Sequence, residues 1–408
     1  MDNPSTILIA HNAYQQRGGE DAVVAAEVRM LEENGHRIVR YSRCSDELKN
    51  RDPLVLLSTG FGSTWASRSF REMTALLAKE KPNVAHFHNI VPLISPAAYY
   101  ACSEAGVPVV QTLHNYRLLC PAATFLHNGQ VCEDCLGRSV AWPGVVKGCY
   151  RHSRPATAAV AIMTAVHRAL ATWQTRIDVY IALSDFSRRK FIEGGLPADR
   201  IVVKPNFVFA DSSRNTGMGE YALFVGRLSE EKGLDLLLSA WRATGKRIPL
   251  RIVGAGPLLE TLSREIADPS LSHVELNGWR TSEEVRYLMR HARFLVFPSI
   301  CFETCGLAIA EAFACGLPVI ASRLGVMEEM VKDGVTGLHF EAGNAVDLAA
   351  KVEWAWSHPK EMAIMGCASR AEYETKYAPE GNYRKMVEIY AAAMKHTHTS
   401  AKAGQRDN

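Results

Sequence analysis

Apolar runs rich in β-branched residues alternate with helix-length amphipathic segments along almost the whole chain. This alternation is typical of βαβ units on a parallel sheet. The strands that we expect in the first half are Thr6–Ala10, Arg37–Tyr41, Val84–His88, Val107–Thr112 and Val179–Ala182. Those of the second half are Tyr221–Val225, Leu250–Val253, His273–Leu276, Phe294–Pro298, Pro318–Ala321 and Gly337–Phe340.

Helical periodicity predicts the segments that connect these strands. The expected helices are Asp21–Asn34, Ser67–Glu80, Ser184–Gly194, Gly233–Ala243, Pro257–Ile266, Ser282–His291, Leu307–Cys315, Val326–Lys332, Asn344–His358 and a last helix at Gly381–Lys395. Each half therefore has its own α/β set, which predicts two doubly wound, Rossmann-like domains. Because ligands of such sheets bind at the carboxyl ends of the strands, we expect a central cleft between the domains.

The domain boundary is expected where Pro, Asn, Ser and Gly cluster without apolar periodicity, from Lys204 to Gly219. This predicts an N-terminal domain over residues 1–205, with a cysteine-containing insertion at 117–155. A C-terminal domain follows over 218–376, and the separate helix at 377–395 comes last.

Composition narrows the class of protein. The 408 residues carry 46 Lys and Arg against 43 Asp and Glu, so the net charge is +3. A dedicated nucleic-acid binder needs a dense cationic face, so we expect no nucleic-acid partner. Within 138–190, however, nine basic residues face two acidic ones. That window is interpreted either as a solvated face or as a surface that meets anionic lipid headgroups or a phosphorylated substrate.

The start of the chain has no basic region before its first apolar run, and the longest apolar stretch, 156–166, is too short to span a membrane. These features predict a cytoplasmic protein. If the basic window contacts lipid, the contact is peripheral, at the inner face of the cytoplasmic membrane.

The strongest chemical signal follows the expected strand that ends at Pro298. Glu303 and Glu311 stand eight positions apart, with Gly306 and Leu307 between them. If a helix begins near Gly306, both carboxylates can face one ligand, and the amides of Gly306 and Leu307 can bind an anion. Carboxylates for hydroxyl groups beside amides for phosphate predict a sugar-nucleotide pocket.

Two further loops follow strands of the second half. Gly226, Arg227 and Lys232 follow Val225, and an Arg fork with a Lys point charge suits a diphosphate. Gly254, Gly256 and Pro257 form a glycine-rich turn after Val253. The third glycine of a dinucleotide fingerprint would fall at Leu259, so a dehydrogenase is disfavoured.

Glycine and polar residues that could contact a ligand also follow three strands of the first half. They are Gly18, Gly19 and Glu20 after the first strand, His88 and Asn89 after the third, and His114 and Asn115 after the fourth. Glycine allows a close approach to a ligand. Histidine in such a position is a candidate ligand contact, although a structural core histidine is the more common case.

Taken in order, these motifs resemble the retaining glycosyltransferases of family 4, which have the GT-B fold, over roughly residues 5–395. The resemblance implies a nucleoside-diphosphate sugar in the C-terminal domain and an acceptor in the N-terminal domain. Lys232 and Arg227 would neutralise the diphosphate, Glu311 would bind the ribose, and Glu303 with the helix amides would hold the sugar and phosphate. It also implies that His114 contacts the transferred sugar and that Gly18 and Gly19 approach the diphosphate.

The function expected from this resemblance is a hexosyltransferase that retains configuration and uses UDP- or GDP-sugar. Its acceptor would be a polysaccharide, lipid-linked oligosaccharide or lipopolysaccharide precursor. No Asp-x-Asp motif occurs, and two cations can replace a metal, so no catalytic cofactor is expected. A sugar-nucleotide epimerase, a phosphorylase or a non-catalytic glycan-binding relative of the same fold remain alternatives. Glu20, His88, Asn89 and Asn115 are the candidate acceptor contacts.

Four cysteines lie close together in the insertion: Cys120, Cys132, Cys135 and Cys149. A C-x2-C pair with two flanking cysteines matches a tetrahedral zinc site, which would stabilise a long insertion. Four incidental thiols are the alternative.

Overall fold

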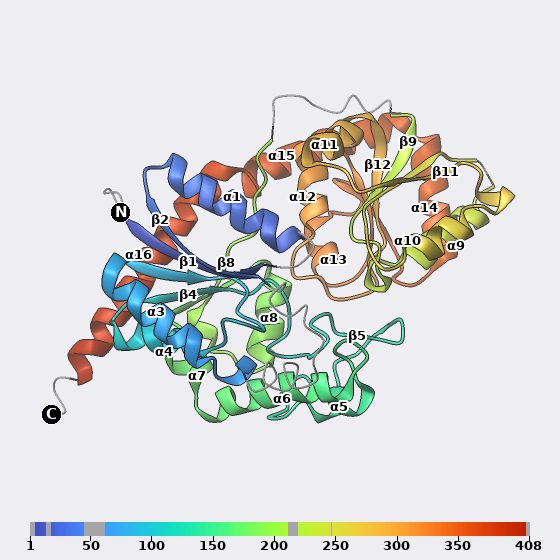
Figure 1. The fold of residues 1–408 in the computed structure, drawn as a ribbon. Helices are drawn as coiled ribbons and strands as arrows, with labels where there is room; N and C mark the ends of the chain where they lie inside the picture. Colours follow the sequence, from blue (N-terminus) through green and yellow to red (C-terminus); the bar gives the residue numbers. More distant parts are fainter. Residues whose placement is uncertain (1–4, 14–17, 45–61, 211–218, 246, 405–408) are drawn as a thin grey trace. The chain divides into compact units, whose positions relative to one another are not determined.

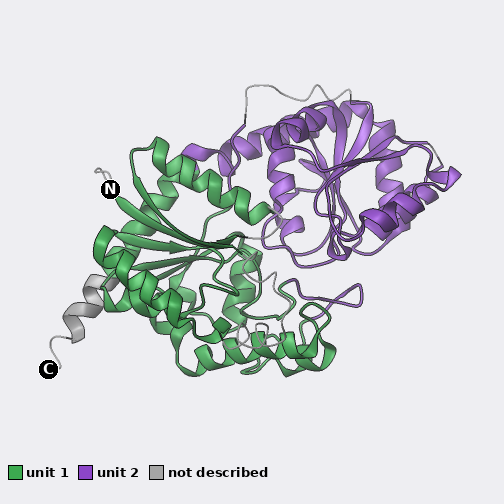
Figure 2. Ribbon diagram, viewed as in Figure 1, with its two compact units in different colours: residues 1–123, 133–205, 382–408 green, residues 124–132, 206–381 purple. Residues whose placement is uncertain are grey.

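The structure is a computed structural model that describes residues 5–13, 18–44, 62–210, 219–245 and 247–404 (Figure 1). The chain divides into two compact units (Figure 2). Unit 1 comprises residues 1–123, 133–205 and 382–408, and unit 2 comprises residues 124–132 and 206–381. Residues 124–132 thus belong to unit 2, which differs from the expected assignment of the whole 117–155 insertion to the N-terminal domain.

Unit 1 is built on a parallel sheet of six strands in the order β2-β1-β3-β4-β7-β8. Its strands are β1 (Thr6–Ala13), β2 (Arg37–Cys44), β3 (Val84–Phe87), β4 (Val109–Thr112), β7 (Val179–Ala182) and β8 (Ile201–Val203). Its helices are α1 (Gly19–Glu33), α3 (Ser67–Glu80), α4 (Ala97–Glu104), α5 (Trp142–Lys147), α6 (Arg154–Ala169), α7 (Thr172–Thr175) and α8 (Asp185–Glu193), with most of α16 (Pro379–Gly404).

Unit 2 has a second parallel sheet, in the order β11-β10-β9-β12-β13-β14. Its strands are β9 (Tyr221–Val225), β10 (Leu250–Val253), β11 (Val274–Gly278), β12 (Ala292–Phe297), β13 (Val319–Ser322) and β14 (Gly337–Phe340). Its helices are α9 (Leu234–Ala243), α10 (Leu259–Glu265), α11 (Ser282–His291), α12 (Leu307–Ala314), α13 (Val326–Met330), α14 (Ala345–Ser357) and α15 (Pro359–Lys376). A short hairpin, β5 (Leu126–His127) with β6 (Gln130–Val131), completes it.

Both faces of the second sheet are buried. Along β9, Ala222 and Phe224 pack into one apolar core, whereas Tyr221 and Leu223 pack into a separate one. Because successive side chains of a strand point to opposite faces, the two cores lie on opposite sides of the sheet. This is the doubly wound arrangement, and the expected α/β fold class is confirmed.

Every expected strand is present, and the differences lie mainly in the helices. The sequence pattern missed α6, although Ser153 caps it by accepting a hydrogen bond from Ala156 N. It also missed α4, α5, α7, α15 and the edge strand β8. Pro359 begins α15 directly after α14, since proline is tolerated in the first turn of a helix.

Candidate active site

The winding of the second sheet reverses between β9 and β12, which are neighbours although the chain visits β10 and β11 between them. Loops at such a switch point form the usual ligand crevice of this fold. The loop after β9 carries Lys232, and the loop after β12 carries Glu303. Ile300 N donates a hydrogen bond of 3.0 Å to Glu231 O, which joins the two loops.

Gly233 makes this junction possible. Its φ is +69°, and a Cβ at this position would lie 2.0 Å from Pro298 O. Any side chain would therefore push the two loops apart. The glycine sets the position of Lys232 beside the second loop.

Lys232 and Glu303 form an ion pair, with 2.5 Å between Lys232 Nζ and Glu303 Oε1. Ser299 Oγ donates a hydrogen bond of 2.8 Å to the same carboxylate oxygen. Burial lowers the pKa of Lys232, but the charge and hydrogen bond of Glu303 together with Cys301 and Glu231 outweigh burial, so the net pKa is raised and the side chain stays an ammonium. The sequence placed these residues in one pocket, and the structure brings them into contact.

Helix α12 begins at Leu307, with Gly306 as its N-cap, as the Glu303–Glu311 spacing suggested. A Cβ at Gly306 would lie 2.7 Å from Ile309 Cδ1, so a larger residue there would require the Ile309 side chain to shift. The Gly306 N–H is not open to a ligand as expected, because it points at Met330 Sδ, 3.4 Å away. The Leu307 N–H lies in the first turn, where the helix supplies no carbonyl partner.

Glu311 lies within α12. Burial raises the pKa of its carboxyl to about 7, against a smaller lowering by Arg286. Among the residues that the structure describes, none forms a hydrogen bond or ion pair with this carboxylate. A partly buried carboxyl of this kind can accept bonds from ligand hydroxyls.

The glycines in the loops after β9 and β10 of unit 2 also have structural roles. A Cβ at Gly254 would lie 1.8 Å from Gly226 O, and one at Gly256 would lie 2.3 Å from Leu228 O. Leu228 N donates a hydrogen bond of 3.0 Å to Ala255 O, which joins the loops after β9 and β10.

Pro257 lies in the turn before α10, and this helix begins at Leu259 rather than at Pro257 as expected. The exposed guanidinium of Arg227 has no hydrogen bond or ion pair with any described residue.

The loop before Glu303 packs on the β5–β6 hairpin. Phe302 N donates to Thr124 O at 3.2 Å, and the Phe125 and Phe302 rings meet edge to face, 5.8 Å between centroids. The turn of the hairpin has positive φ at Asn128 and Gly129, the usual sequence of a two-residue turn. The Asn128–Gly129 pair is a local signal for such a turn, whereas the contact of the hairpin with the candidate site has no local signal.

In unit 1 the winding reverses between β1 and β3. Gly18, just before Gly19 begins α1, donates its N–H to Asp21 Oδ2 at 2.9 Å. Asn115 Nδ2 donates to Glu20 Oε1 at 3.0 Å, which links the loop after β4 to the start of α1. These residues come together at one edge of the sheet, as expected for loops that follow parallel strands.

Two expected acceptor contacts are corrected by the structure. The His88 side chain is fully buried, and Asn89 is 8% exposed. Asn89 holds β1 and β3 together, because its Nδ2 donates to Asn12 O and its Oδ1 accepts from Val91 N. Neither residue is therefore in a position to touch an acceptor; both stabilise the sheet edge.

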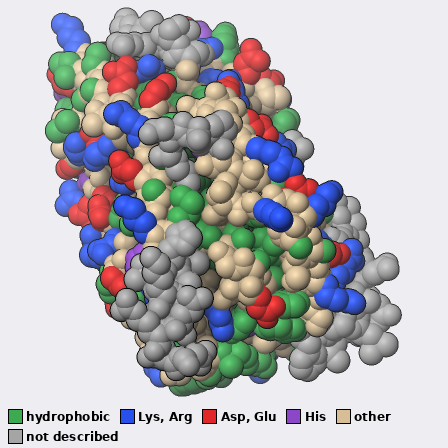
Figure 3. All heavy atoms as spheres, turned by 90° about the vertical axis from the view of Figure 1, so that its left-hand side faces the viewer, with side chains coloured by type: hydrophobic (Ala, Val, Ile, Leu, Met, Phe, Trp, Pro, Cys, Tyr) green, Lys and Arg blue, Asp and Glu red, His purple; other side chains and the backbone are tan. Residues whose placement is uncertain are grey.

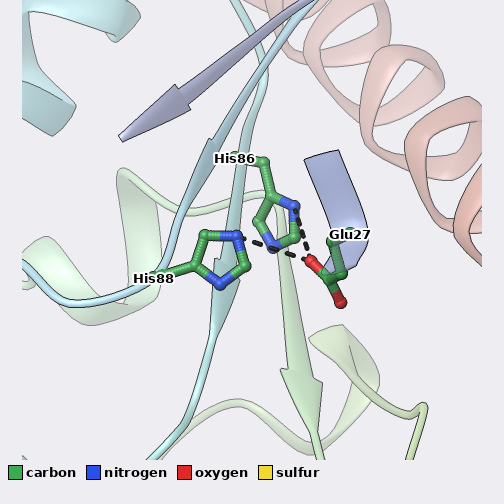
Figure 4. Close-up of side chains that lie close together, drawn as sticks. All are labelled: Glu27, His86 and His88. Atoms are coloured by element: carbon green, nitrogen blue, oxygen red, sulfur yellow. Dashed lines mark ion pairs between the residues drawn. The ribbon is translucent and has the colours of Figure 1, made fainter. Parts of the chain in front are cut away.

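His88 belongs to a buried polar network that the sequence pattern missed in part (Figure 4). Glu27 lies on α1. Its Oε1 is 2.9 Å from Lys204 Nζ, and its Oε2 is 3.5 Å from His88 Nε2. His88 Nδ1 lies 2.8 Å from His114 Nε2. A signal for Glu27 exists in the sequence: this acid stands one turn after Val23 and one turn before Leu31, on the apolar face of its helix.

Gly144 of unit 1 lies close to the Cys135 sulfur and to the backbone of Cys149. A Cβ at Gly144 would lie 3.3 Å from Cys135 Sγ and 3.1 Å from Pro121 Cγ, and Pro121 directly follows Cys120. Cys149 N donates to Gly144 O at 3.1 Å. Cys132 precedes Cys135 by three positions, and no disulfide joins cysteines of the described residues. Among the described residues, these cysteines do not form a group of three or more whose ligand atoms all lie within 4.8 Å of one another.

Helices α5 and α6, which pack on one another, carry exposed apolar side chains inside the basic window. They are Trp142 and Val146 on α5, and Ile162 and Val166 on α6. No helix of the described residues is long and apolar enough to cross a membrane. On the face drawn in Figure 3, by contrast, basic and acidic side chains are interspersed.

Comparisons with known proteins agree with this architecture. The model described as Glycosyltransferase Family 4 matches residues 17–211, and that described as Glycosyl transferases group 1 matches residues 209–372. Sucrose-phosphate synthase of Thermosynechococcus elongatus superposes with a TM-score of 0.71 at 16% identity, covering 95% of this chain and 98% of that one. The Anabaena HepE protein in complex with UDP gives 0.66 at 17% identity, with 95% and 100% covered.

Sequence relatives match in part. An uncharacterized glycosyltransferase of Methanocaldococcus jannaschii is 34% identical over 178 residues, 44% of this chain and 49% of that protein. A GDP-mannose-dependent alpha-(1-6)-phosphatidylinositol monomannoside mannosyltransferase of Mycolicibacterium smegmatis is 31% identical over 219 residues, 47% of this chain and 56% of that protein. The chain spans about half the length of the curated relatives it matches.

The two parallel sheets and their strand orders define a protein of the GT-B class, built from two Rossmann-like domains. The chain belongs to the glycosyltransferases of family 4, since the two family models together match residues 17–372.

Proposed function

We propose that this chain transfers a hexose from a UDP- or GDP-sugar, with retention of configuration and without a catalytic metal, to a polysaccharide, lipid-linked oligosaccharide or lipopolysaccharide precursor. The observation that carries the proposal is the Lys232–Glu303 pair at the switch point of the second sheet, beside the start of α12. The family and the UDP and GDP-mannose named for its relatives support a nucleotide-sugar donor.

The chemistry of the site fits departure of a diphosphate. Lys232 and Arg227 supply two positive charges where the leaving group develops negative charge, which is the main requirement of this step. Leu307 N–H adds a donor at the positive end of α12. Glu303 neutralises the Lys232 ammonium before the donor binds and offers a carboxylate to sugar hydroxyls, while Glu311 would bind the ribose.

Unit 1 would supply the remaining contacts. His114 is partly exposed, in contrast to His88, and is the residue that would meet the transferred sugar. Gly18 and Gly19 at the start of α1 would approach the diphosphate, and Glu20 with Asn115 would meet the acceptor. This leaves His88 and Asn89 with structural roles.

A screen of nucleotide sugars by thermal shift tests the donor, because a ligand that binds only the native state raises the apparent stability. Product analysis with the stabilising donor then separates the alternatives. Transfer to an added glycan supports the proposal. Conversion of the nucleotide sugar with release of free sugar and no acceptor product would instead indicate the epimerase, and binding without turnover would indicate a non-catalytic relative.

Peripheral membrane contact is part of the proposal. The exposed apolar residues of α5 and α6 lie in the chain segment with nine basic residues against two acidic ones. Apolar side chains flanked by bases match a surface that binds anionic lipid. Such contact would place the enzyme at the inner face of the cytoplasmic membrane, near a lipid-linked acceptor.

We also propose a structural zinc ion held by the four cysteines of the insertion. The sequence pattern supports this assignment, because Cys132 and Cys135 form a C-x2-C pair with Cys120 and Cys149 on either side. Zinc would stabilise the fold of the insertion and would take no part in the transfer.

A further inference from the structure

Glu27, His88 and His114 form a chain of contacts that leads from a buried carboxylate to a partly exposed imidazole, all within unit 1. Figure 4 shows the His88 ring turned toward the Glu27 carboxylate. The question that this chain answers is which nitrogen of His114 carries the ring proton.

The Glu27 end of the chain is an ionised carboxylate. Burial raises its pKa, but the Lys204 ammonium, 2.9 Å from Oε1, and the neighbouring imidazoles outweigh burial, so the net pKa is lowered. Lys204 Nζ also donates to Asn382 Oδ1 at 2.8 Å, which fixes the ammonium in place. An ionised carboxylate can only accept hydrogen bonds.

His88 must therefore turn an N–H toward Glu27. Glu27 Oε2 and His88 Nε2 are buried and face each other at 3.5 Å, and neither atom has a regular hydrogen-bond partner among the described residues. The opposite tautomer would set the lone pair of His88 Nε2 against the carboxylate. Burial also holds the pKa of His88 well below its usual value, so the ring is neutral and its Nδ1 is an acceptor.

The direction of the next bond follows. His88 Nδ1 and His114 Nε2 are 2.8 Å apart, and only one proton can lie between them. Since His88 Nδ1 accepts, His114 Nε2 must donate.

We propose that Glu27 and His88 are positioning residues that fix the ring proton of His114 on Nε2 and make Nδ1 the accepting nitrogen of that ring. The inference refines the proposed function and rests on it for one consequence: a hydroxyl of the transferred sugar would be the donor of its bond to His114. A donor sugar that lacks this hydroxyl would then be a poorer substrate.

A metal ion is the other chemistry that Glu27, His86 and His88 suggest, because their ligand atoms lie within 4.8 Å of one another. The surroundings favour the hydrogen-bond network instead. Both His86 nitrogens already have partners, at 2.9 Å from the Tyr390 hydroxyl and 2.7 Å from Thr112 Oγ1. The Lys204 ammonium already neutralises the carboxylate, and a divalent cation beside it would be repelled.

The test is nitrogen NMR of the full chain labelled with ¹⁵N-histidine, in which a scalar coupling across an N–H···N bond shows both the bond and the ring that holds the proton. Signals of His114 are assigned by their loss in His114→Gln. We expect the bridging proton on His114 Nε2, coupled to His88 Nδ1. A bridging proton on His88 Nδ1, or a metal-bound His88 without such a proton, would overturn the inference.

Glu27→Gln sharpens this test. Lys204 can only donate, so it would hold the new amide oxygen and turn the amide N–H groups toward His88 Nε2. His88 would then carry its proton on Nδ1 and donate to His114, and the bridging proton would change rings. Glu33→Gln, on the exposed face of the same helix, is the control and should leave the proton on His114. If Glu27→Gln fails to fold, the wild-type spectrum still decides.

An activity readout separates this inference from the proposed function. With the proton moved, we expect kcat/KM for the sugar donor to fall about tenfold, as for one altered hydrogen bond, while affinity for the free nucleoside diphosphate is unchanged. If no donor is turned over at all, the proposed function fails and the spectrum still tests the inference. If transfer stands but the proton lies on His88, the inference alone fails.

Discussion

Lys232 Nζ lies 2.5 Å from Glu303 Oε1, and the two residues come from loops that follow different strands of one sheet. Replacing Glu303 by Ala should lower the transfer rate about a hundredfold to a thousandfold, as for loss of one group that stabilises the transition state. The fold should persist, because both side chains are only partly buried and water can solvate the remaining ammonium. Initial-rate and thermal-unfolding measurements check this, with the exposed Glu361→Ala as control. Retained turnover would remove Glu303 from the active site.

Binding of the nucleoside diphosphate should survive chelation of divalent metals, because Lys232 and Arg227 supply the compensating charge. Arg227→Met should weaken binding about tenfold, as for loss of a charge-assisted hydrogen bond, whereas the exposed Arg247→Met should not. Titration calorimetry with UDP and GDP, with and without EDTA, measures both effects. A strict requirement for Mg²⁺ would contradict the metal-free site.

The amino-acid sequence predicts the fold more completely than it predicts the candidate site. Strands such as Leu250–Val253 are buried on both faces, so their apolar runs can be recognised without knowledge of the partners. Helix α6 was missed because apolar side chains such as Ile162 and Val166 also stand on its exposed side, so the apolar run 156–166 hides the helical period. The expected positions of Glu303, Glu311 and Leu307 follow from one local spacing, and the helix start confirms that geometry.

Relations between distant segments could not be predicted. Nothing near Gly254 in the sequence reveals that Gly226 O occupies the space of its Cβ. His88 and His114 both follow strands, yet His88 is buried beside Glu27, from a distant helix, whereas His114 is partly exposed. Local patterns thus identify which residues reach the sheet edge, while tertiary packing decides which of them face a ligand.

Ionisation of Glu311 should cost stability. Its pKa is about 7 in the folded chain against an ordinary value of 4.5, so the folded state binds more protons between these values. Stability from this group is therefore present below about pH 4.5 and is lost as the pH rises through 7. Relative to wild type, Glu311→Gln should gain about 1–3 kcal/mol between pH 5 and pH 8. Urea unfolding at both pH values measures the difference; an equal difference at both would show an unperturbed carboxyl.

The exposed side chains of α6 should contribute to membrane binding. Replacing Ile162 and Val166 together by Glu removes apolar surface and adds two negative charges, so co-sedimentation with phosphatidylglycerol vesicles should fall strongly. The control is Ile364→Glu on α15, which is 71% exposed and outside the basic window. Binding should weaken with added salt, because salt screens the basic residues. Equal binding to neutral phosphatidylcholine vesicles would argue against the role of the basic window.

The cysteines of the insertion should bind about one zinc ion per chain, as in a structural four-thiolate site. Cys135 is the informative position because it belongs to the C-x2-C pair. Its Sγ would lie 3.3 Å from a Cβ at Gly144. Cys135→Ser should lose the metal and lower the unfolding temperature by about 5 °C, because metal binding adds to folding stability. The exposed Cys367→Ser should keep both metal and stability. Elemental analysis of the purified chain, with thermal unfolding before and after chelation, measures both. Finding no metal in protein expressed with zinc would show that the four thiols pack without an ion.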